Sequence, residues 1–564
     1  MEQEQPKLKI IPLGGVEEVG RNMTIFEYGN DIVIIDLGFQ FPEETMPGID
    51  YIIPNVSYLK NKIDKIQGVI ITHGHYDHIG AIPYVSSELG NPPIYATALT
   101  AGIILKRQEE FPYKPKLNIH KIDRHSRLKL GSFEVEFFHV NHNIPDGVGV
   151  VLKTPVGTIV HSGDFKFDHS PIGDSPADIS RIAQIGGKGV LCLLSDSTDA
   201  DRPGYCLSEK NIQDELDLIF KVAQGRIVVA TFSSLIQRIQ EIINLSQRYG
   251  RKLVIDGFSM KTNVEIARHL GFLKIPRGML IKASQADRYP DNKMVILCTG
   301  AQGEERAVLM RIANREHRFT RIRENDSVIF SSSVVPGNER SVQELKDLLV
   351  RQGAKVYHSA LMDIHASGHG YQEDLKMMIN LIKPKFFIPI HGHFYMLKTH
   401  AELAQSIGIK PENIIIPSNG LIIYVTPEKI FTKGERVPAN YVMVDGLGVG
   451  DVGQIVLRDR QTMAQDGMFV IITIIDSQTG QVKTSPDIIS RGFIYLKESR
   501  ELLREVRKKT IRIVEDAIVQ TNSKNGHPTI NDTYIKNNIR EELGKFLYER
   551  TRRRPMVLPV LIQI

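Results

Sequence analysis

The chain has 564 residues, of which 42% are hydrophobic and 24% are charged, and its formal net charge is +5. This length predicts three or four domains, and the composition is that of a globular protein with a substantial core. No apolar stretch reaches the length of a membrane span, and the polar start Met1–Lys7 lacks a signal-peptide pattern. The three scattered cysteines exclude a disulfide framework and indicate the cytoplasm. The mildly basic charge permits a nucleic-acid partner without predicting one.

Short strands are expected to dominate the first two hundred residues. Apolar runs predict strands at 8–13, 23–28, 32–36, 67–72, 132–140, 147–154 and 157–162, with a hairpin turn at 29–31. Helical patterns are expected around 80–90 and 97–110. Many strands with few helices predict a β-sandwich flanked by helices.

After about residue 208 the pattern changes to strand–loop–helix units. Strands are predicted at 227–231, 252–256, 294–298 and 327–330, followed in turn by helices at 235–249, 260–270, 304–315 and 339–352. Four such units predict right-handed crossovers and a parallel sheet. A helix at 372–382 and a strand at 386–390 return to the pattern of the first two hundred residues, so the α/β segment is expected to be an insertion.

A last unit is expected to begin near residue 455. It combines predicted strands at 467–475 and 492–496 with helices at 498–520 and 531–548, and it ends in the apolar tail 556–564. The basic run 550–554 is expected to be a solvated face rather than an RNA contact.

A dense group of metal-binding residue types follows the apolar run 68–71. His73, His75, Asp77 and His78 all lie in one short loop. Imidazoles and carboxylates suit Zn²⁺, Mn²⁺ or Fe. His73 and His75 can turn toward one ion, whereas the adjacent Asp77 and His78 diverge and can serve a second ion beside it. Two metals about 3.5–4 Å apart can clamp a phosphate or acyl oxygen, so we interpret the loop as part of a dinuclear centre rather than as solvated histidines.

The remaining ligands are expected at the ends of later strands. His142, Asp164 and His391 each follow an apolar strand pattern, and one rim of a sheet can gather such positions. Asp164 is placed to bridge both ions. His139 competes with His142 but lies inside the predicted strand, where packing is the simpler interpretation. Asp36 is either a carboxylate that orients a ligand histidine or a strand-terminal turn residue.

Polar loops recur at the carboxyl ends of the parallel strands. Ser233 and Ser234, with the loops 299–303 and 331–333, fall on the rim where open α/β sheets bind ligands. A 5′-phosphate pocket there would let an enzyme start at a monophosphorylated end, although each loop alone reads as an ordinary turn. The segment 365–369 can donate several hydrogen bonds to phosphate. Phe232 and Tyr371 are candidates for base stacking or for packing.

These motifs resemble those of the metallo-β-lactamase-fold hydrolases, and the inserted α/β segment resembles the β-CASP subgroup, whose members act on nucleic acids. Within that subgroup the chain is similar to the bacterial ribonuclease J family nearly from end to end. The resemblance is carried by residues 12–16, 48–50, 194–197, 365–370, 383–387, 445–451, 489–493, 546–550 and 553–556. It implies a metallo-β-lactamase αββα sandwich (1–207 and 370–454), interrupted by a parallel α/β β-CASP domain (208–369) and followed by a small α+β domain (455–564).

The resemblance also implies a set of site residues. One zinc would be held by His73, His75, His142 and Asp164, and the other by Asp77, His78, Asp164 and His391. Asp196 would position or deprotonate the nucleophile, and His369 would donate to the scissile phosphate or assist the leaving 3′-oxygen. Together with the rim loops, the resemblance assigns substrate binding to His365, Ser367, Gly368, His369, Ser233 and Ser234. The resemblance to some members of this family also implies a hard cation such as Ca²⁺ at the Gly48 carbonyl, Asp50 and Asp445, with a turn residue as the alternative for Asp50.

Some positions depart from the pattern of this family. Tyr76 stands where an acidic residue is common, and Leu235 and Gln237 replace an asparagine and a histidine. His393 and Tyr395 replace the glutamate and the arginine of the more familiar His-Gly-Glu-Tyr-Arg-Met run. These changes affect the expected grip on the substrate, whereas all seven metal-ligand positions are filled.

The function implied is that of an RNA-cleaving hydrolase with two Zn²⁺ ions, with Mn²⁺ or Mg²⁺ able to serve in activity. Both 5′→3′ exoribonuclease and endoribonuclease activity are expected, with 5′-phosphate products and roles in RNA decay and in rRNA and mRNA maturation. The expected partner is single-stranded RNA with a 5′-monophosphate, and the expected assembly is a homodimer or tetramer without a membrane. A DNA-directed β-CASP nuclease and a non-catalytic RNA-binding partner subunit stay open as alternatives, although the intact ligand set disfavours the second.

Overall fold

The computed structural model describes residues 7–43, 45–334, 337–359, 361–362, 364–495, 498–520 and 530–564. The chain divides into two compact units: Met1–Gln40 with Ile53–Tyr441, and Phe41–Ile52 with Val442–Ile564. Among the helices of the described residues, none combines the length and the apolar character that a membrane crossing requires.

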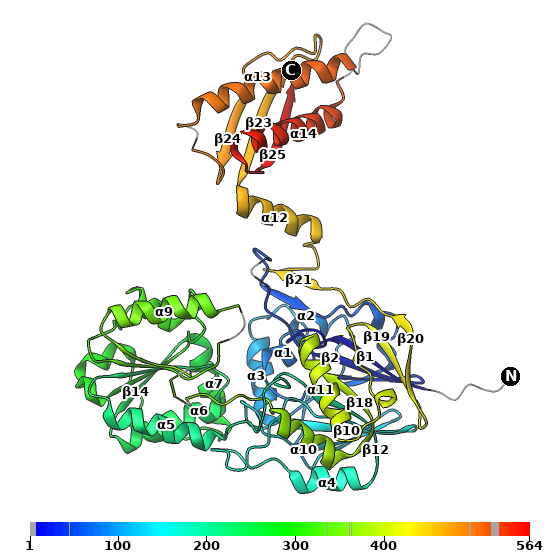
Figure 1. Cartoon of the computed structure of the whole chain (residues 1–564), viewed down its shortest axis with the longest axis vertical. Helices are drawn as coiled ribbons and strands as arrows, with labels where there is room; N and C mark the ends of the chain where they lie inside the picture. The colour runs from blue at the N-terminus through cyan, green and yellow to red at the C-terminus, as the bar shows by residue number, and fades with distance from the viewer. Residues whose placement is uncertain are drawn as a thin grey trace, which may run out of the picture. The chain divides into compact units, whose positions relative to one another are not determined.

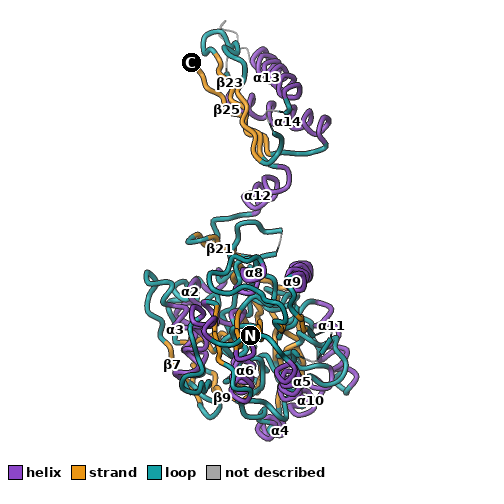
Figure 2. The backbone as a smooth tube through the Cα atoms, turned by 90° about the vertical axis from the view of Figure 1, so that its left-hand side faces the viewer, coloured by secondary structure: helices purple, strands orange, loops and turns teal. Residues whose placement is uncertain are grey.

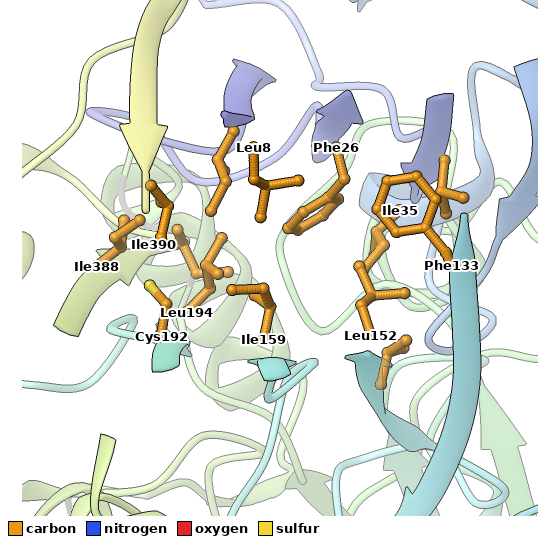
Figure 3. Packing of buried hydrophobic residues seen from close by; sticks show 14 of the residues in the cluster. Leu8, Phe26, Ile35, Phe133, Leu152, Ile159, Cys192, Leu194, Ile388 and Ile390 are labelled. Atoms are coloured by element: carbon orange, nitrogen blue, oxygen red, sulfur yellow. The ribbon is translucent and has the colours of Figure 1, made fainter. Parts of the chain in front are cut away.

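The first unit contains the predicted sandwich. One sheet has eight strands, in the order β20 (Ile430–Arg436), β19 (Leu421–Val425), β1 (Leu8–Gly14), β2 (Met23–Tyr28), β3 (Asp31–Ile35), β5 (Ile66–Ile70), β6 (Ile94–Ala96) and β7 (Ile119–Lys121). The other has six: β18 (Pro384–Ile390), β12 (Val190–Asp196), β11 (Gly157–His161), β10 (Val148–Thr154), β9 (Phe133–His139) and β8 (Arg127–Leu130). Side chains such as Phe26, Ile35, Leu152 and Ile159 fill the space between the sheets (Figure 3). Burial of this apolar surface drives the two layers together.

Helices cover the other face of the six-stranded sheet. The helices α4 (Ile179–Gly187), α10 (Gln372–Ile382) and α11 (Phe394–Ser406) share a second apolar cluster with that sheet (Figure 1). The expected helix at 80–90 is wrong in detail, because two short helices, α1 (Tyr76–Ile79) and α2 (Ile82–Val85), take its place. Pro83 lies in the first turn of α2, where its missing N–H costs nothing. The helix predicted at 97–110 is α3 (Ala98–Gln108).

The inserted segment is the parallel α/β domain that the strand–helix units predict. Its five strands run parallel in the order β14 (Lys252–Asp256), β15 (Met294–Cys298), β13 (Ile227–Ala230), β16 (Ser327–Phe330) and β17 (Lys355–Tyr357). The helices are α5 (Glu209–Val222), α6 (Ile236–Arg248), α7 (Phe258–His269), α8 (Val308–Ala313) and α9 (Glu339–Arg351). The spacing of Val342, Leu345 and Leu349 gives α9 one buried apolar stripe. The helix predicted at 304–315 covers only the residues of α8.

The second unit carries two small sheets. Strands β22 (Gly448–Val449), β21 (Val442–Asp445) and β4 (Tyr51–Ile53) form one, and α12 (Gln454–Asp466) follows. Strands β24 (Asp487–Arg491), β23 (Met468–Ile475) and β25 (Met556–Gln563) form the other, and Figure 2 shows α13 (Arg500–Gln520) and α14 (Asp532–Thr551) on one side of it. The strand predicted at 492–496 is wrong by five residues, because Gly492 has φ +70° and ends β24.

Candidate metal centre

Five strands of the first unit end in the residues of one site. His73, His142 and Asp164 each come three residues after a strand, β5, β9 and β11, whereas Asp196 and His391 stand at the ends of β12 and β18. The last three strands are neighbours and run parallel, so their carboxyl ends meet at one edge. Side chains that are hundreds of residues apart in the sequence therefore converge.

The seven predicted ligands form two adjoining groups. In the first, the His75 Nδ1 atom lies 3.1 Å from His73 Nε2 and 3.0 Å from His142 Nε2. In the second, Asp77 Oδ2 lies 3.4 Å from His78 Nε2 and 3.3 Å from His391 Nε2. Each group brings its ligand atoms within 4.8 Å of one another.

Asp164 stands between the two groups. Its Oδ2 atom lies 3.2 Å from His78 Nε2, 3.7 Å from His73 Nε2 and 3.8 Å from His142 Nε2. The Nε2 atom of His391 is buried and, among the described residues, meets Asp77 Oδ2 only as an ion pair and without the geometry of a hydrogen bond. Buried ring nitrogens and carboxylate oxygens that face one another are the donor set of a divalent cation, so the residues fit metal binding.

Burial prepares the histidines of the first group for this role. Burial lowers the pKa of His73 and His142 well below the usual value, and it lowers the pKa of His75 to about 4. The rings are therefore neutral at pH 7, which is the form that binds metal. Burial acts to raise the pKa of Asp164, but His391 and His78 lower it well below its usual value, so this carboxylate is ionised.

Further side chains orient the ligands. The buried Asp36 carboxylate accepts hydrogen bonds from the Thr72 backbone N–H at 2.8 Å and from His78 Nδ1 at 2.7 Å, so it orients His78 rather than only closing a turn. The packed His139 has its two ring nitrogens against the carbonyls of Gly147 and Ser175, as its position in a strand predicts.

Two orienting contacts are missing from the sequence predictions. The hydroxyl of Thr198 lies 2.8 Å from His391 Nδ1, and the carbonyl oxygen of Gly368 accepts from His142 Nδ1 at 2.7 Å. Thr198 follows Asp196 by two residues at the end of β12, which is the one sequence signal that could have found it. The carbonyl of Gly368 has no such signal, because any residue carries one.

Asp196 and His369 form a pair beside these groups. His369 Nδ1 lies 2.7 Å from Asp196 Oδ2, and the His369 ring centroid is 4.8 Å from that of His142 and 5.5 Å from that of His391. Thr198 donates to the other Asp196 oxygen from its hydroxyl at 2.8 Å. Burial opposes protonation of His369, but the Asp196 carboxylate raises its pKa above the usual value.

The predicted substrate residues divide into two sets. The loop 364–370 reaches the centre through Gly368 and His369, and the Ser367 hydroxyl donates to Asp199. His365 is buried enough that its pKa falls to about 3, and its Nδ1 has no hydrogen-bond partner among the described residues. Ser233 and Ser234 lie after β13, where Asn263 donates to the Ser233 carbonyl; the structure brings them to the parallel-sheet rim and not into the metal groups.

The predicted calcium position holds an arginine. Nη1 of Arg460 donates to the Gly48 carbonyl at 3.1 Å, and Nη2 donates to the Asp445 carboxylate. Asp50 accepts instead from the Gly446 backbone N–H at 2.8 Å. A guanidinium already neutralises these oxygens and would repel a second cation, so the residues do not fit Ca²⁺.

The positions that depart from the family pattern have separate environments. The rings of His393 and Tyr395 are nearly parallel, at 9° with centroids 6.3 Å apart, and both side chains are exposed at the start of α11. Tyr76 stacks on Phe39, and Gln237 donates to Asp174 at 3.2 Å. Leu235 is buried.

Four family models match successive parts of the chain. They describe a beta-lactamase superfamily domain at residues 33–180, a ribonuclease J beta-CASP domain at 224–349, a Zn-dependent metallo-hydrolase RNA specificity domain at 353–417 and a ribonuclease J C-terminal domain at 455–564.

Three relatives match over nearly the full length. The chain is 40% identical to ribonuclease J 1 of Streptococcus pyogenes over 98% of this chain and 97% of that protein. It is 38% identical to ribonuclease J2 of Bacillus subtilis over 99% of both chains, and 38% identical to ribonuclease J 2 of Staphylococcus aureus over the whole of both. A solved structure of a protein of unknown function from Enterococcus faecalis shares the fold over 74% of this chain and all of that one, with a TM-score of 0.52 and 16% identity.

Proposed function

Because this chain belongs to the ribonuclease J family and is an RNA-cleaving hydrolase that uses divalent metal, we propose that it has both 5′→3′ exoribonuclease and endoribonuclease activity and leaves 5′-phosphate products. The observation that supports this proposal is the convergence of seven predicted metal ligands, five of them buried, with the Asp196–His369 pair. The cellular roles that follow are RNA decay and maturation of rRNA and mRNA in the cytoplasm.

The metal ions are two Zn²⁺, with Mn²⁺ or Mg²⁺ able to serve in activity. His73, His75 and His142 would hold one, Asp77, His78 and His391 would hold the other, and Asp164 would contribute to both. When bound, they supply Lewis-acid stabilisation of the negative charge that develops on the phosphate.

Asp196 and His369 divide the proton chemistry. The Asp196 carboxylate holds Nδ1–H of His369, which aims the second ring nitrogen away from it. That nitrogen donates a proton to the scissile phosphate or to the leaving 3′-oxygen, and the raised pKa of His369 keeps the proton available at neutral pH. Asp196 also positions or deprotonates the attacking water.

The substrate is single-stranded RNA with a 5′-monophosphate. His365, Ser367, Gly368 and His369 bind the phosphate chain beside the metal groups, and the rim that carries Ser233 and Ser234 takes the 5′ end. We assign the metal chemistry to residues 1–207 and 370–454, further RNA contacts to 208–369 and assembly to 455–564.

The C-terminal segment supports a homodimer or tetramer. On β25, Leu558, Val560 and Ile562 expose apolar side chains on the sheet face opposite α13 and α14. Burial of such a face against a second copy removes apolar surface from water.

One experiment tests the activity and its alternatives. Matched single-stranded RNA and DNA oligomers, with a 5′-monophosphate or a 5′-hydroxyl, are incubated with purified protein and Mn²⁺. We expect stepwise release of 5′-nucleotides from monophosphorylated RNA and internal cleavage of RNA whose 5′ end is blocked. Equal cleavage of DNA would favour the DNA-directed alternative, and RNA binding without cleavage would favour the partner-subunit alternative.

A further inference from the structure

A fully buried arginine lies in the inserted domain, beside the start of the 364–370 loop. Arg238, in α6, exposes none of its side chain. Its guanidinium donates to Glu209 at 2.7 Å, to Glu241 at 3.1 Å, to the Ser331 hydroxyl, and to the backbone carbonyl of Ile364 at 2.9 Å. A buried charge is retained only where such partners satisfy it.

One of the two carboxylate partners, Glu209, links this arginine to the metal-binding sandwich. Glu209 begins α5, and its other oxygen lies 3.6 Å from the Nζ atom of Lys166, which is also buried. Lys166 follows the bridging ligand Asp164 by two residues. The backbone N–H of Glu209 donates to Asp168 at 2.9 Å. The network therefore spans from the inserted domain to the loop that carries a metal ligand.

The Ile364 carbonyl is the start of the loop that completes the site. It accepts two hydrogen bonds, from Arg238 and from the Ser331 hydroxyl, the second at 2.9 Å. Four residues later the Gly368 carbonyl accepts from His142 Nδ1, and His369 follows with its bond to Asp196. Residues 364–370 lie in no helix or strand, so side-chain contacts replace ladder bonds in holding this backbone.

The loop also approaches His142 closely. A Cβ atom on Gly368 would come within 2.5 Å of the His142 ring, so the backbone of the loop lies directly against that ring. The partner on the second ring nitrogen sets the tautomer and the direction of a ligand histidine.

We propose that Arg238 is a positioning residue of the metal centre: it holds the Ile364 carbonyl, and through the loop 364–369 it aligns Gly368 with His142. The core of the inserted domain thereby sets the metal affinity of the His73, His75 and His142 group. The effect on cleavage rests on the proposed function, whereas the effect on metal binding does not.

The test compares two buried arginines of the same domain. Arg226 is also buried and donates to Asp326 at 3.0 Å, but the residues it bonds lie outside the loop. Zinc affinity of Arg238→Met, Arg238→Lys and Arg226→Met is measured by chelator competition, with kcat and KM for RNA. We expect Arg238→Met to weaken the affinity for one of two zinc equivalents about 10–100-fold and to lower kcat more than it raises KM. Arg238→Lys should recover part of the zinc affinity and part of kcat. Arg226→Met should lower the melting temperature alone.

Ser331→Ala provides a second route if Arg238→Met does not fold. It removes one of the two bonds to the Ile364 carbonyl without leaving a charge unpaired, and we expect a several-fold loss of zinc affinity. Wild-type zinc binding in the folded Arg238 or Ser331 variants, or an equal loss in Arg226→Met, overturns the proposal. If the wild-type protein binds zinc but does not cleave RNA, the zinc titrations still decide it while the proposed function fails.

Discussion

Replacement of Asp36 by asparagine tests whether the buried carboxylate controls metal binding through His78. The carboxylate accepts from the Thr72 N–H, from the Thr72 hydroxyl and from His78 Nδ1, the last at 2.7 Å. Asparagine keeps one acceptor oxygen and turns an NH₂ group toward one of these donors. The loss of a charge-assisted hydrogen bond costs about 1.5–3 kcal/mol, and the loss of an orienting partner weakens metal affinity about 10–100-fold.

The backbone makes asparagine the informative substitution. Asp36 has φ +63°, a left-handed conformation that asparagine adopts readily and alanine does not. Asp36→Asn therefore changes the side chain without adding backbone strain. In a chelator competition we expect the affinity for one metal equivalent to be about 10–100-fold weaker. We also expect cleavage to recover when excess metal is added.

Asp31→Asn is the matched control. Asp31 lies at the preceding hairpin turn and accepts from the Ser132 backbone N–H at 2.8 Å and from the Ser132 hydroxyl, without a metal ligand among these partners. This variant is expected to lose stability and to keep its metal affinity. Unchanged metal binding in folded Asp36→Asn, or an equal loss in Asp31→Asn, refutes the reasoning.

Four further outcomes are expected. Asp77→Ala combined with His78→Ala abolishes RNA cleavage and leaves the far-UV circular dichroism spectrum unchanged; retained cleavage contradicts the second metal group. Burial acts to raise the pKa of Glu209, but the adjacent arginine and lysine lower it to about 2. The ionised Glu209 therefore stabilises the fold above pH 4.5, and this stabilisation is lost as the pH falls toward 2. In that window Glu209→Gln should flatten the dependence of the melting temperature on pH, and an unchanged slope contradicts this. Millimolar Ca²⁺ should not raise the melting temperature of the wild-type protein. Arg460→Met should be less stable and should be stabilised by Ca²⁺, because it leaves the Gly48 and Asp445 oxygens without a cation. A rise in the melting temperature of the wild type with Ca²⁺ counts against the assignment of these oxygens to Arg460. Tyr395→Arg should tighten RNA binding and steepen the slope of log affinity against log salt concentration by about 0.7, the value for one added phosphate contact on a single strand. An unchanged slope shows that residue 395 does not contact the RNA phosphate backbone.

The elements that the sequence predicts well are those whose pattern is local. Alternating and continuous apolar runs predict most strands of the sandwich, and the strand–helix repeats predict the parallel sheet. The failures have local causes of another kind. Hydrophobic periodicity does not report the break between α1 and α2 at residues 80–81, nor the end of β24 at Gly492, where the backbone has a positive φ.

The sequence by itself determined that His73, His75, Asp77 and His78 lie in one short segment, because ligands within six residues need no tertiary information to be recognised. The structure places Asp77 and His78 of this segment in helix α1. Only the tertiary structure decided which distant groups orient them: Asp36 on His78, Thr198 on His391 and the Gly368 carbonyl on His142. It also decided that Arg460, 412 residues from Gly48, stands where oxygen ligands alone suggest calcium. The physical reason is that hydrogen bonds and charge pairs between remote segments depend on distances that exist only after the strands have packed, and a backbone carbonyl carries no mark in the sequence.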